Sequence, residues 1–89
     1  MEMFTGAQVR MARAFLKWSI ADLAEKSGVG ISTIQRIEGE EGFPAARGGN
    51  IDAVYKTLSA AGVTFLPENE DGIGVRGKTK GRRAKSPEI

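Results

Sequence analysis

The sequence predicts one small, mostly helical domain of four or five helices, followed by a short two-stranded β ribbon and a basic tail. Apolar residues recur at helical spacing through most of residues 5–62, and the period changes to two after Gly62. Positive charge then accumulates at the end of the chain. We therefore divide the chain into a helical domain over residues 1–62, a ribbon of the same domain over 63–77, and a tail over 78–89 that we expect to be disordered.

The first helix is predicted to begin after Thr5. Threonine is a favoured N-cap residue, and Gln8 stands three positions later, so each side chain can satisfy a backbone N–H group of the opening turn. The helix should continue to about Lys17. The side chains that it turns toward the core recur at helical spacing and are Val9, Ala12 and Leu16.

The next two helices are short and meet at a glycine corner. Ser19 is the predicted N-cap of the first, with Asp22 complementing the positive end of the helix dipole. Gly28 permits the chain to reverse, and the following helix ends near Gly39. The apolar positions of the pair recur at helical spacing and are Leu23, Ala24, Val29, Ile34 and Ile37. This pattern predicts a helix-turn-helix, although an ordinary helical hairpin has the same packing requirements.

Residues 39–49 include four glycines and Pro44 without an apolar period, which predicts a loop. Asn50 is a favourable N-cap for a fourth helix, which Gly62 ends in a left-handed conformation. This helix closes the core through one apolar face, which consists of Ile51, Val54, Tyr55, Leu58 and Ala61.

The ribbon is predicted from two short alternating runs. Residues 63–66 form the first strand and residues 72–76 the second, and the acidic residues 67–72 form an exposed loop between them. Two strands alone are marginally stable in water. The ribbon therefore either packs on the helices or pairs its edges with a second subunit, and the second arrangement would produce a dimer.

Composition excludes several classes of function. The chain has 89 residues without cysteine or histidine, which excludes disulfides, thiolate chemistry, zinc sites built on these ligands and histidine-based catalysis. We find no nucleophile-base pair and no phosphate-cradling loop, so we expect no enzymatic activity, no metal and no cofactor. No apolar run approaches the length of about 20 residues that a membrane span requires, so we expect a soluble, cytoplasmic protein without membrane contact.

Several motif positions resemble a known family. Leu23-Ala24, Gly28-Val29, Ile34 and Ile37-Glu38 resemble, in order and spacing, the Xre/Cro/C1 phage-repressor family of helix-turn-helix transcriptional regulators. The resemblance covers about residues 5–62. It implies a lambda-repressor-like fold that binds double-stranded DNA, with the second helix of the motif lying in the major groove.

The resemblance also implies which residues contact DNA. The candidates that face the bases are Gly30, Ile31, Ser32, Thr33, Gln35 and Arg36. The candidates that contact phosphate are Ser19, Ile20 through its backbone amide, and Arg47. The chain departs from the family in carrying Ile20 where a phosphate-binding glutamine is common, and Gly30 where a serine or threonine N-cap is common.

Two further features follow from charge. In the resembling family an arginine of the first helix pairs with the glutamate that ends the third, so we expect Arg13 and Glu38 to form a structural pair. The net charge is +2, and the positive excess is in the tail. Its basic residues either bind the DNA backbone as a flexible arm or are simply solvated, and they are Arg76, Lys78, Lys80, Arg82, Arg83 and Lys85.

From these observations we expect a sequence-specific DNA-binding regulator of transcription that acts as a homodimer on an operator of two half-sites. The alternative is a protein-interaction module, such as an antitoxin that represses its own promoter through the helix-turn-helix and binds a toxin through the ribbon or tail. A partner that copurifies would distinguish the second function from the first.

Overall fold

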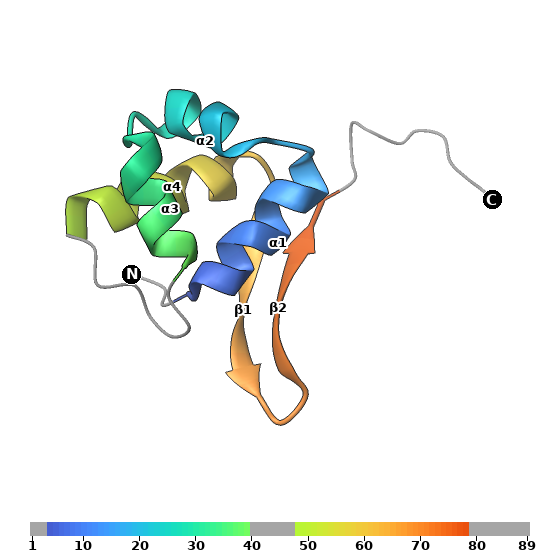
Figure 1. Ribbon diagram of the computed structural model, residues 1–89. Coiled ribbons are helices and arrows are strands. Elements are labelled where there is room, and N and C mark those ends of the chain that lie inside the picture. The colour runs from blue at the N-terminus through green and yellow to red at the C-terminus, as the bar shows by residue number, and fades with distance from the viewer. Residues whose placement is uncertain (1–3, 40–47, 79–89) are drawn as a thin grey trace.

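The computed structural model describes residues 4–39 and 48–78, which form four helices and one two-stranded antiparallel sheet (Figure 1). The elements are α1 (Gly6–Leu16), α2 (Ile20–Ser27), α3 (Ile31–Glu38), α4 (Gly48–Ala60), β1 (Val63–Asn69) and β2 (Gly72–Gly77). The prediction of a mostly helical domain followed by a two-stranded ribbon is confirmed. The predicted tail lies outside the described residues, except for Lys78. No helix in the described ranges is long and apolar enough to cross a membrane.

The first two helices begin at the predicted caps. The Thr5 hydroxyl accepts from the Gln8 N–H, and the Gln8 side chain accepts from the Thr5 N–H at 2.9 Å. Ser19 and Asp22 form the same reciprocal box at the start of α2. Each box satisfies two backbone N–H groups that a helix end otherwise leaves without a partner. Lys17 ends α1 in the left-handed conformation, with φ of 62°.

The start of α4 differs from the prediction. The helix begins at Gly48, so Asn50 lies within its first turn and is not the N-cap. Gly48 and Gly49 lack the Cβ that narrows the backbone choices of other residues, so the capping preference of Asn50 does not fix where the helix starts. The end of α4 follows the prediction, since Gly62 has φ of 103° directly before β1. Most of the predicted loop, residues 40–47, lies outside the described residues.

One core joins the helices to the base of the ribbon. Its buried apolar side chains come from every helix and from β1, and they are Phe4, Val9, Ala12, Leu23, Val29, Ile34, Ile37, Ile51, Val54, Leu58, Val63 and Phe65. Where β1 joins the core, the Phe65 ring stacks on Phe4, with ring centroids 4.8 Å apart, and on Tyr55, with centroids 5.7 Å apart. Residues that are distant in sequence are thereby held around one aromatic group.

The strands extend further than predicted. The predicted first strand and loop were residues 63–66 and 67–72, but β1 continues through Pro67 to Asn69. An irregularity in the register between Leu66 and Asn69 accommodates Pro67, whose missing N–H group costs no regular ladder bond at a bulge. The turn itself is tight. The Asn69 side chain accepts from the Asp71 N–H at 2.7 Å, and Gly72 has φ of 99°.

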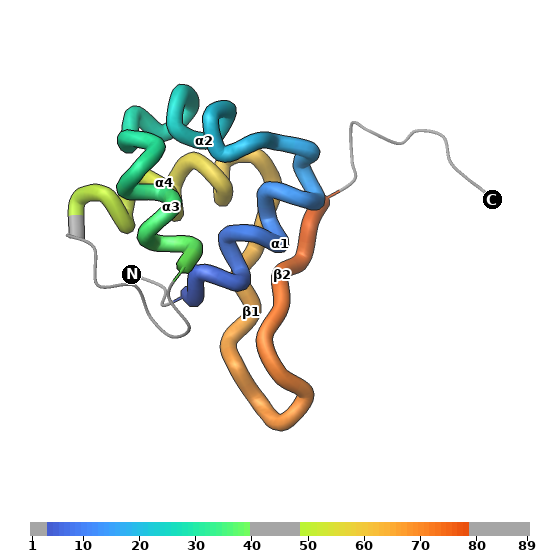
Figure 2. Tube along the Cα trace, viewed as in Figure 1, coloured from blue at the N-terminus to red at the C-terminus, as the bar shows by residue number. Residues whose placement is uncertain are grey.

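The ribbon packs on the helices at its base. Val63 and Phe65 are only 2% and 5% exposed, and the Phe15 ring lies where a Cβ at Gly77 would be. Figure 2 shows both strands continuing from this base to a tip that lies clear of the helices. Of the two arrangements that the sequence left open, packing on the helices is therefore present within one chain.

A buried glutamine fastens the ribbon to α1. Gln8 is 2% exposed, and its Nε2 group donates to the carbonyl oxygen of Leu66 at 2.9 Å and to that of Gly74 at 2.8 Å. Its Oε1 atom accepts from Thr5 in the capping box. All the hydrogen-bonding capacity of this amide is thus used, as a buried polar group requires.

Replacing Gln8 with glutamate should therefore separate its two roles. The carboxylate of Gln8→Glu can still accept from the Thr5 N–H, but it cannot donate to Leu66 or Gly74. We expect a loss of about 2 to 4 kcal/mol in the free energy of unfolding, because two partly buried carbonyl groups lose their donor. Urea denaturation followed by circular dichroism measures this loss. The matched change Gln35→Glu, on an exposed position of α3, should cost less than about 0.5 kcal/mol, and an equal cost for both variants would contradict the proposed role of Gln8.

Candidate nucleic-acid interface

The chain reverses between α2 and α3 in a short turn. Gly28 has φ of 77°, and its N–H donates to the Ala24 carbonyl at 2.9 Å, which ends α2. A left-handed residue at this place suits glycine, which has no Cβ to clash. The Ser27 hydroxyl accepts from the Val29 N–H at 3.2 Å, and Val29 is buried. The turn is therefore fixed by its backbone conformation, by one side-chain hydrogen bond and by an apolar anchor.

The two faces of α3 differ sharply. Ile34 and Ile37 are at most 1% exposed and pack into the core. The opposite face is exposed, and Thr33 lies half-buried at its border. The predicted base-facing residues on this exposed face are Gly30, Ile31, Ser32, Gln35 and Arg36. Ile31 is 48% exposed, and it and Met11 are the two large apolar side chains that are exposed among the described residues. The structure thus brings the candidates together as one solvent-facing surface.

The N-terminus of α3 lacks a side-chain cap. Gly30 occupies the N-cap position without a side-chain hydrogen bond, as its lack of a side chain requires. The first intrahelical bond runs from the Ile34 N–H to the Gly30 carbonyl at 3.0 Å. The N–H groups of the opening turn of α3 therefore point outward next to the exposed side chains, where they can donate to an anionic group.

At the N-terminus of α2, the Asp22 carboxylate already occupies part of the predicted phosphate site. The Ser19 N–H donates to the Asp22 carboxylate at 2.9 Å, and the Ser19 hydroxyl accepts from the Asp22 N–H at 2.9 Å. An anion bound here must share the site with this carboxylate, which leaves the N–H groups of Ile20 and Ala21. The Ile20 side chain is partly buried against the core, so only its backbone can reach a phosphate.

Protonation of the Asp22 carboxylate would weaken the cap at the start of α2. The backbone hydrogen bond from Ser19 lowers the pKa of Asp22 below its ordinary value. A carboxylate with a lowered pKa stabilises the folded state at neutral pH. That contribution is lost as the pH falls through the lowered value.

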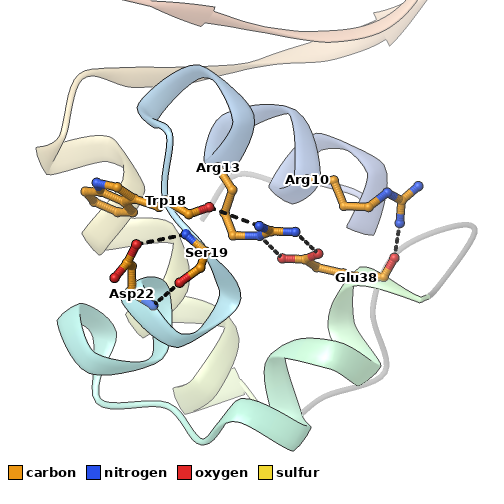
Figure 3. A network of polar contacts seen from close by, with 6 residues as sticks. All are labelled: Arg10, Arg13, Trp18, Ser19, Asp22 and Glu38. Atoms are coloured by element: carbon orange, nitrogen blue, oxygen red, sulfur yellow. Dashed lines mark hydrogen bonds and ion pairs between the residues drawn. The ribbon is translucent and has the colours of Figure 1, made fainter.

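Arg13 and Glu38 form the pair that the resemblance implies (Figure 3). The Arg13 Nε donates to Glu38 Oε2 at 2.6 Å and its Nη2 donates to Oε1 at 2.8 Å, which is a bidentate geometry. Arg13 Nη1 donates to the Trp18 carbonyl at 3.0 Å. The side chains are only 19% and 6% exposed, and the hydrogen bond to Glu38 raises the pKa of Arg13 above its ordinary value in spite of desolvation. The pair connects α1, the α1–α2 corner and the end of α3.

Two further residues of α1 hold the same end of α3. Arg10 Nη1 donates to the backbone carbonyl of Glu38. A Cβ at Gly6 would overlap the carbonyl oxygens of Ile37 and Glu38, so only glycine permits this close approach. Neither residue was predicted from the sequence. A basic residue one helical turn before Arg13 was the available signal for Arg10, whereas nothing local marked Gly6.

One predicted phosphate contact is not placed by the structure. Arg47 lies outside the described residues.

The contribution of the Arg13–Glu38 pair to stability is measurable by a double-mutant cycle. We expect Glu38→Ala to cost about 1 to 3 kcal/mol in the free energy of unfolding, because it leaves a partly buried guanidinium without its carboxylate. The cycle combines Glu38→Ala with Arg13→Ala and compares the double variant with the sum of the single variants. A coupling energy of zero would contradict the structural role.

The exposed pair Lys56–Asp52 provides the control. Its charged atoms are 3.1 Å apart, but its side chains are 73% and 41% exposed. A solvated pair one turn apart on a helix should couple by only about 0.3 to 0.5 kcal/mol.

No protein-family model matches this chain, and neither does any curated protein. The functional argument therefore depends on the geometry of the α2–α3 pair and on the chemistry of its exposed side chains.

Proposed function

We propose that this protein is a sequence-specific double-stranded DNA-binding regulator of transcription, in which α2 and α3 form a helix-turn-helix of the lambda-repressor type. In this proposal α3 enters the major groove and α2 lies across the sugar-phosphate backbone. The observation that carries the proposal is the exposed face of α3, where hydroxyl, amide and guanidinium groups lie together on a helix whose other face is buried.

The chemistry of this face suits base edges. The Arg36 guanidinium can donate two hydrogen bonds to the O6 and N7 atoms of guanine, and the Gln35 amide can pair with adenine in the same bidentate manner. The exposed Ile31 side chain offers an apolar contact for the methyl group of thymine. Ser32 is exposed at the uncapped start of the helix, where its hydroxyl and the backbone N–H groups can bind a base or a phosphate.

The exposed side chains of α3 are not involved in holding the helix in place. Arg10 and Arg13 are bonded to Glu38, whereas the Arg36 side chain makes no hydrogen bond or ion pair within residues 4–39 and 48–78. Its guanidinium is therefore not used to hold α3 against the described part of the chain. The basic tail would add affinity that does not depend on sequence, because contacts to phosphate release counterions without reading bases.

The proposal includes a homodimer on an operator of two half-sites. Val63 and Phe65 are buried in the core of their own chain, so they cannot form the contact between the two subunits. Leu66 and Ile73 remain half-exposed on the ribbon outside the core cluster. We assign the contact between subunits to this part of the ribbon, together with its unpaired strand edges.

Arg36→Ala should weaken binding selectively. After selection of a preferred duplex from random DNA, we expect the variant to lose about 1 to 3 kcal/mol on that duplex and to lose its preference at one base-pair position. Binding to random duplex should change little. Fluorescence anisotropy titrations of both duplexes at several salt concentrations measure the two effects.

Lys56→Ala is the matched control, because it removes one positive charge from the exposed surface of α4. It should leave the preference for the selected duplex intact. If Arg36→Ala weakened both duplexes by the same factor, or if no duplex were preferred, the proposed role of α3 in reading bases would be wrong.

Sedimentation equilibrium tests the dimer. We expect the whole chain to be dimeric at micromolar concentration, and Ile73→Asp to make it monomeric, because a carboxylate at the contact would be desolvated without a partner. Ala21→Asp places the same charge on an exposed position of α2 and should leave the dimer intact. A monomeric parent protein would remove the dimer from the proposal.

A further inference from the structure

A surface cavity lies where the end of α4 meets the base of the ribbon. It has a volume of about 390 Å³, and the lining residues that matter here are Tyr55, Ser59, Ala60, Thr64 and Lys78. This size falls in the range of about 300 to 1,000 Å³ that small-molecule sites occupy. None of the lining residues belongs to α2 or α3. The cavity is therefore a feature separate from the surface assigned to DNA.

The polar side chains around this cavity have no partner among the described residues. Tyr55, Ser59 and Thr64 each bring a hydroxyl group, and Lys78 brings an ammonium group. Within residues 4–39 and 48–78, none of these four groups makes a side-chain hydrogen bond or an ion pair. Polar side chains elsewhere, such as Gln8 and Arg13, are fully engaged by contrast. The cavity thus gathers donors that the fold itself does not use.

The chemistry of the lining selects for an anion with an apolar body. Among the described residues, no carboxylate lines the cavity and Lys78 is the only charged residue that does. Hydroxyl and ammonium donors together favour a carboxylate or phosphate group. The apolar wall is provided by Ala60 and by the Tyr55 ring, which is stacked on Phe65.

The cavity is held in shape by the backbone. The Lys78 N–H donates to the Gly62 carbonyl at 2.9 Å, which joins the end of β2 to the beginning of β1. Gly62 lies in the left-handed region with φ of 103°, and a Cβ there would be 3.4 Å from the Lys78 Cβ. The position of Lys78 at the rim is therefore fixed relative to α4.

We propose that this cavity binds a small organic anion, which carries a carboxylate or phosphate group on a compact apolar body. The anionic group would lie between Lys78 and the hydroxyls of Ser59 and Thr64, and the apolar body would lie against Tyr55 and Ala60. A ligand there would contact α4, the start of β1 and the residue that follows β2. It would therefore stabilise the packing of the ribbon base against α4. This proposal does not depend on DNA binding.

Nuclear magnetic resonance of the full ¹⁵N-labelled chain tests the proposal with phenyl phosphate and benzoate as probes. We expect saturable shifts confined to the backbone amides around the cavity, chiefly those of Gly62, Thr64 and Lys78. Inorganic phosphate, which lacks the apolar body, should bind about tenfold more weakly, a difference of about 1.4 kcal/mol. Benzyl alcohol, which lacks the charge, should give no saturable shift.

Two variants sharpen this test. Lys78→Gln should weaken the binding of phenyl phosphate about tenfold, which corresponds to about 1.4 kcal/mol, whereas Lys56→Gln removes a charge from α4 at a position outside the cavity and should not. Thr64→Val should weaken it by a smaller factor, and the spectrum of each unliganded variant shows that it is folded. Equal effects of Lys78→Gln and Lys56→Gln, equal binding of benzyl alcohol, or no saturable binding of either anionic probe would overturn the proposal. A duplex DNA that shifted the cavity amides would also overturn it, because the cavity would then be a contact for the phosphate backbone.

Discussion

The position of α3 depends on how its last turn is held by α1. The Arg13–Glu38 pair provides a bidentate bond in a site that water barely reaches, Arg10 binds the final carbonyl, and Gly6 allows the two backbones to approach closely. A helix of eight residues is not stable by itself in water. Its last turn is therefore defined by tertiary contacts, and the exposed residues of its first turns follow from that placement.

The ribbon depends on a second polar connection of the same kind. Gln8 satisfies the opening turn of α1 and two strand carbonyls with a single amide, and Phe65 of β1 stacks on Phe4 in the core. Two strands alone would be marginal, so the ribbon obtains its order from α1 and the core. Both connections originate on α1, which makes this helix the common support for the rest of the described chain.

Sequence reasoning succeeded where structure is set by near neighbours. The N-caps at Thr5 and Ser19, the capping box at Thr5 and the helix-ending glycines follow from residue types at fixed short spacings. It failed for β1, because Pro67 ordinarily indicates the end of a strand and the bulge that tolerates it has no local signal. The bonds from Gln8 to the ribbon could not be predicted either. The spacing of Gln8 from Thr5 already accounted for its residue type as a capping residue, and the two strand carbonyls that it binds lie 58 and 66 residues away in sequence. For the candidate site, the helical period gave the exposed face of α3, whereas the competition of Asp22 for the start of α2 appeared only in the geometry.

The separation between the anchored end of α3 and its exposed face has an evolutionary consequence. Ile31, Ser32, Gln35 and Arg36 are exposed, so substitutions among them alter the presented chemistry with little effect on folding. Gly6, Arg13 and Glu38 have no such freedom, because a change in any of them disturbs a buried contact. Descendants of this chain can therefore diverge rapidly in the chemistry of this surface while they keep the same scaffold. Residues of the first kind would vary among paralogues, and residues of the second kind would be retained.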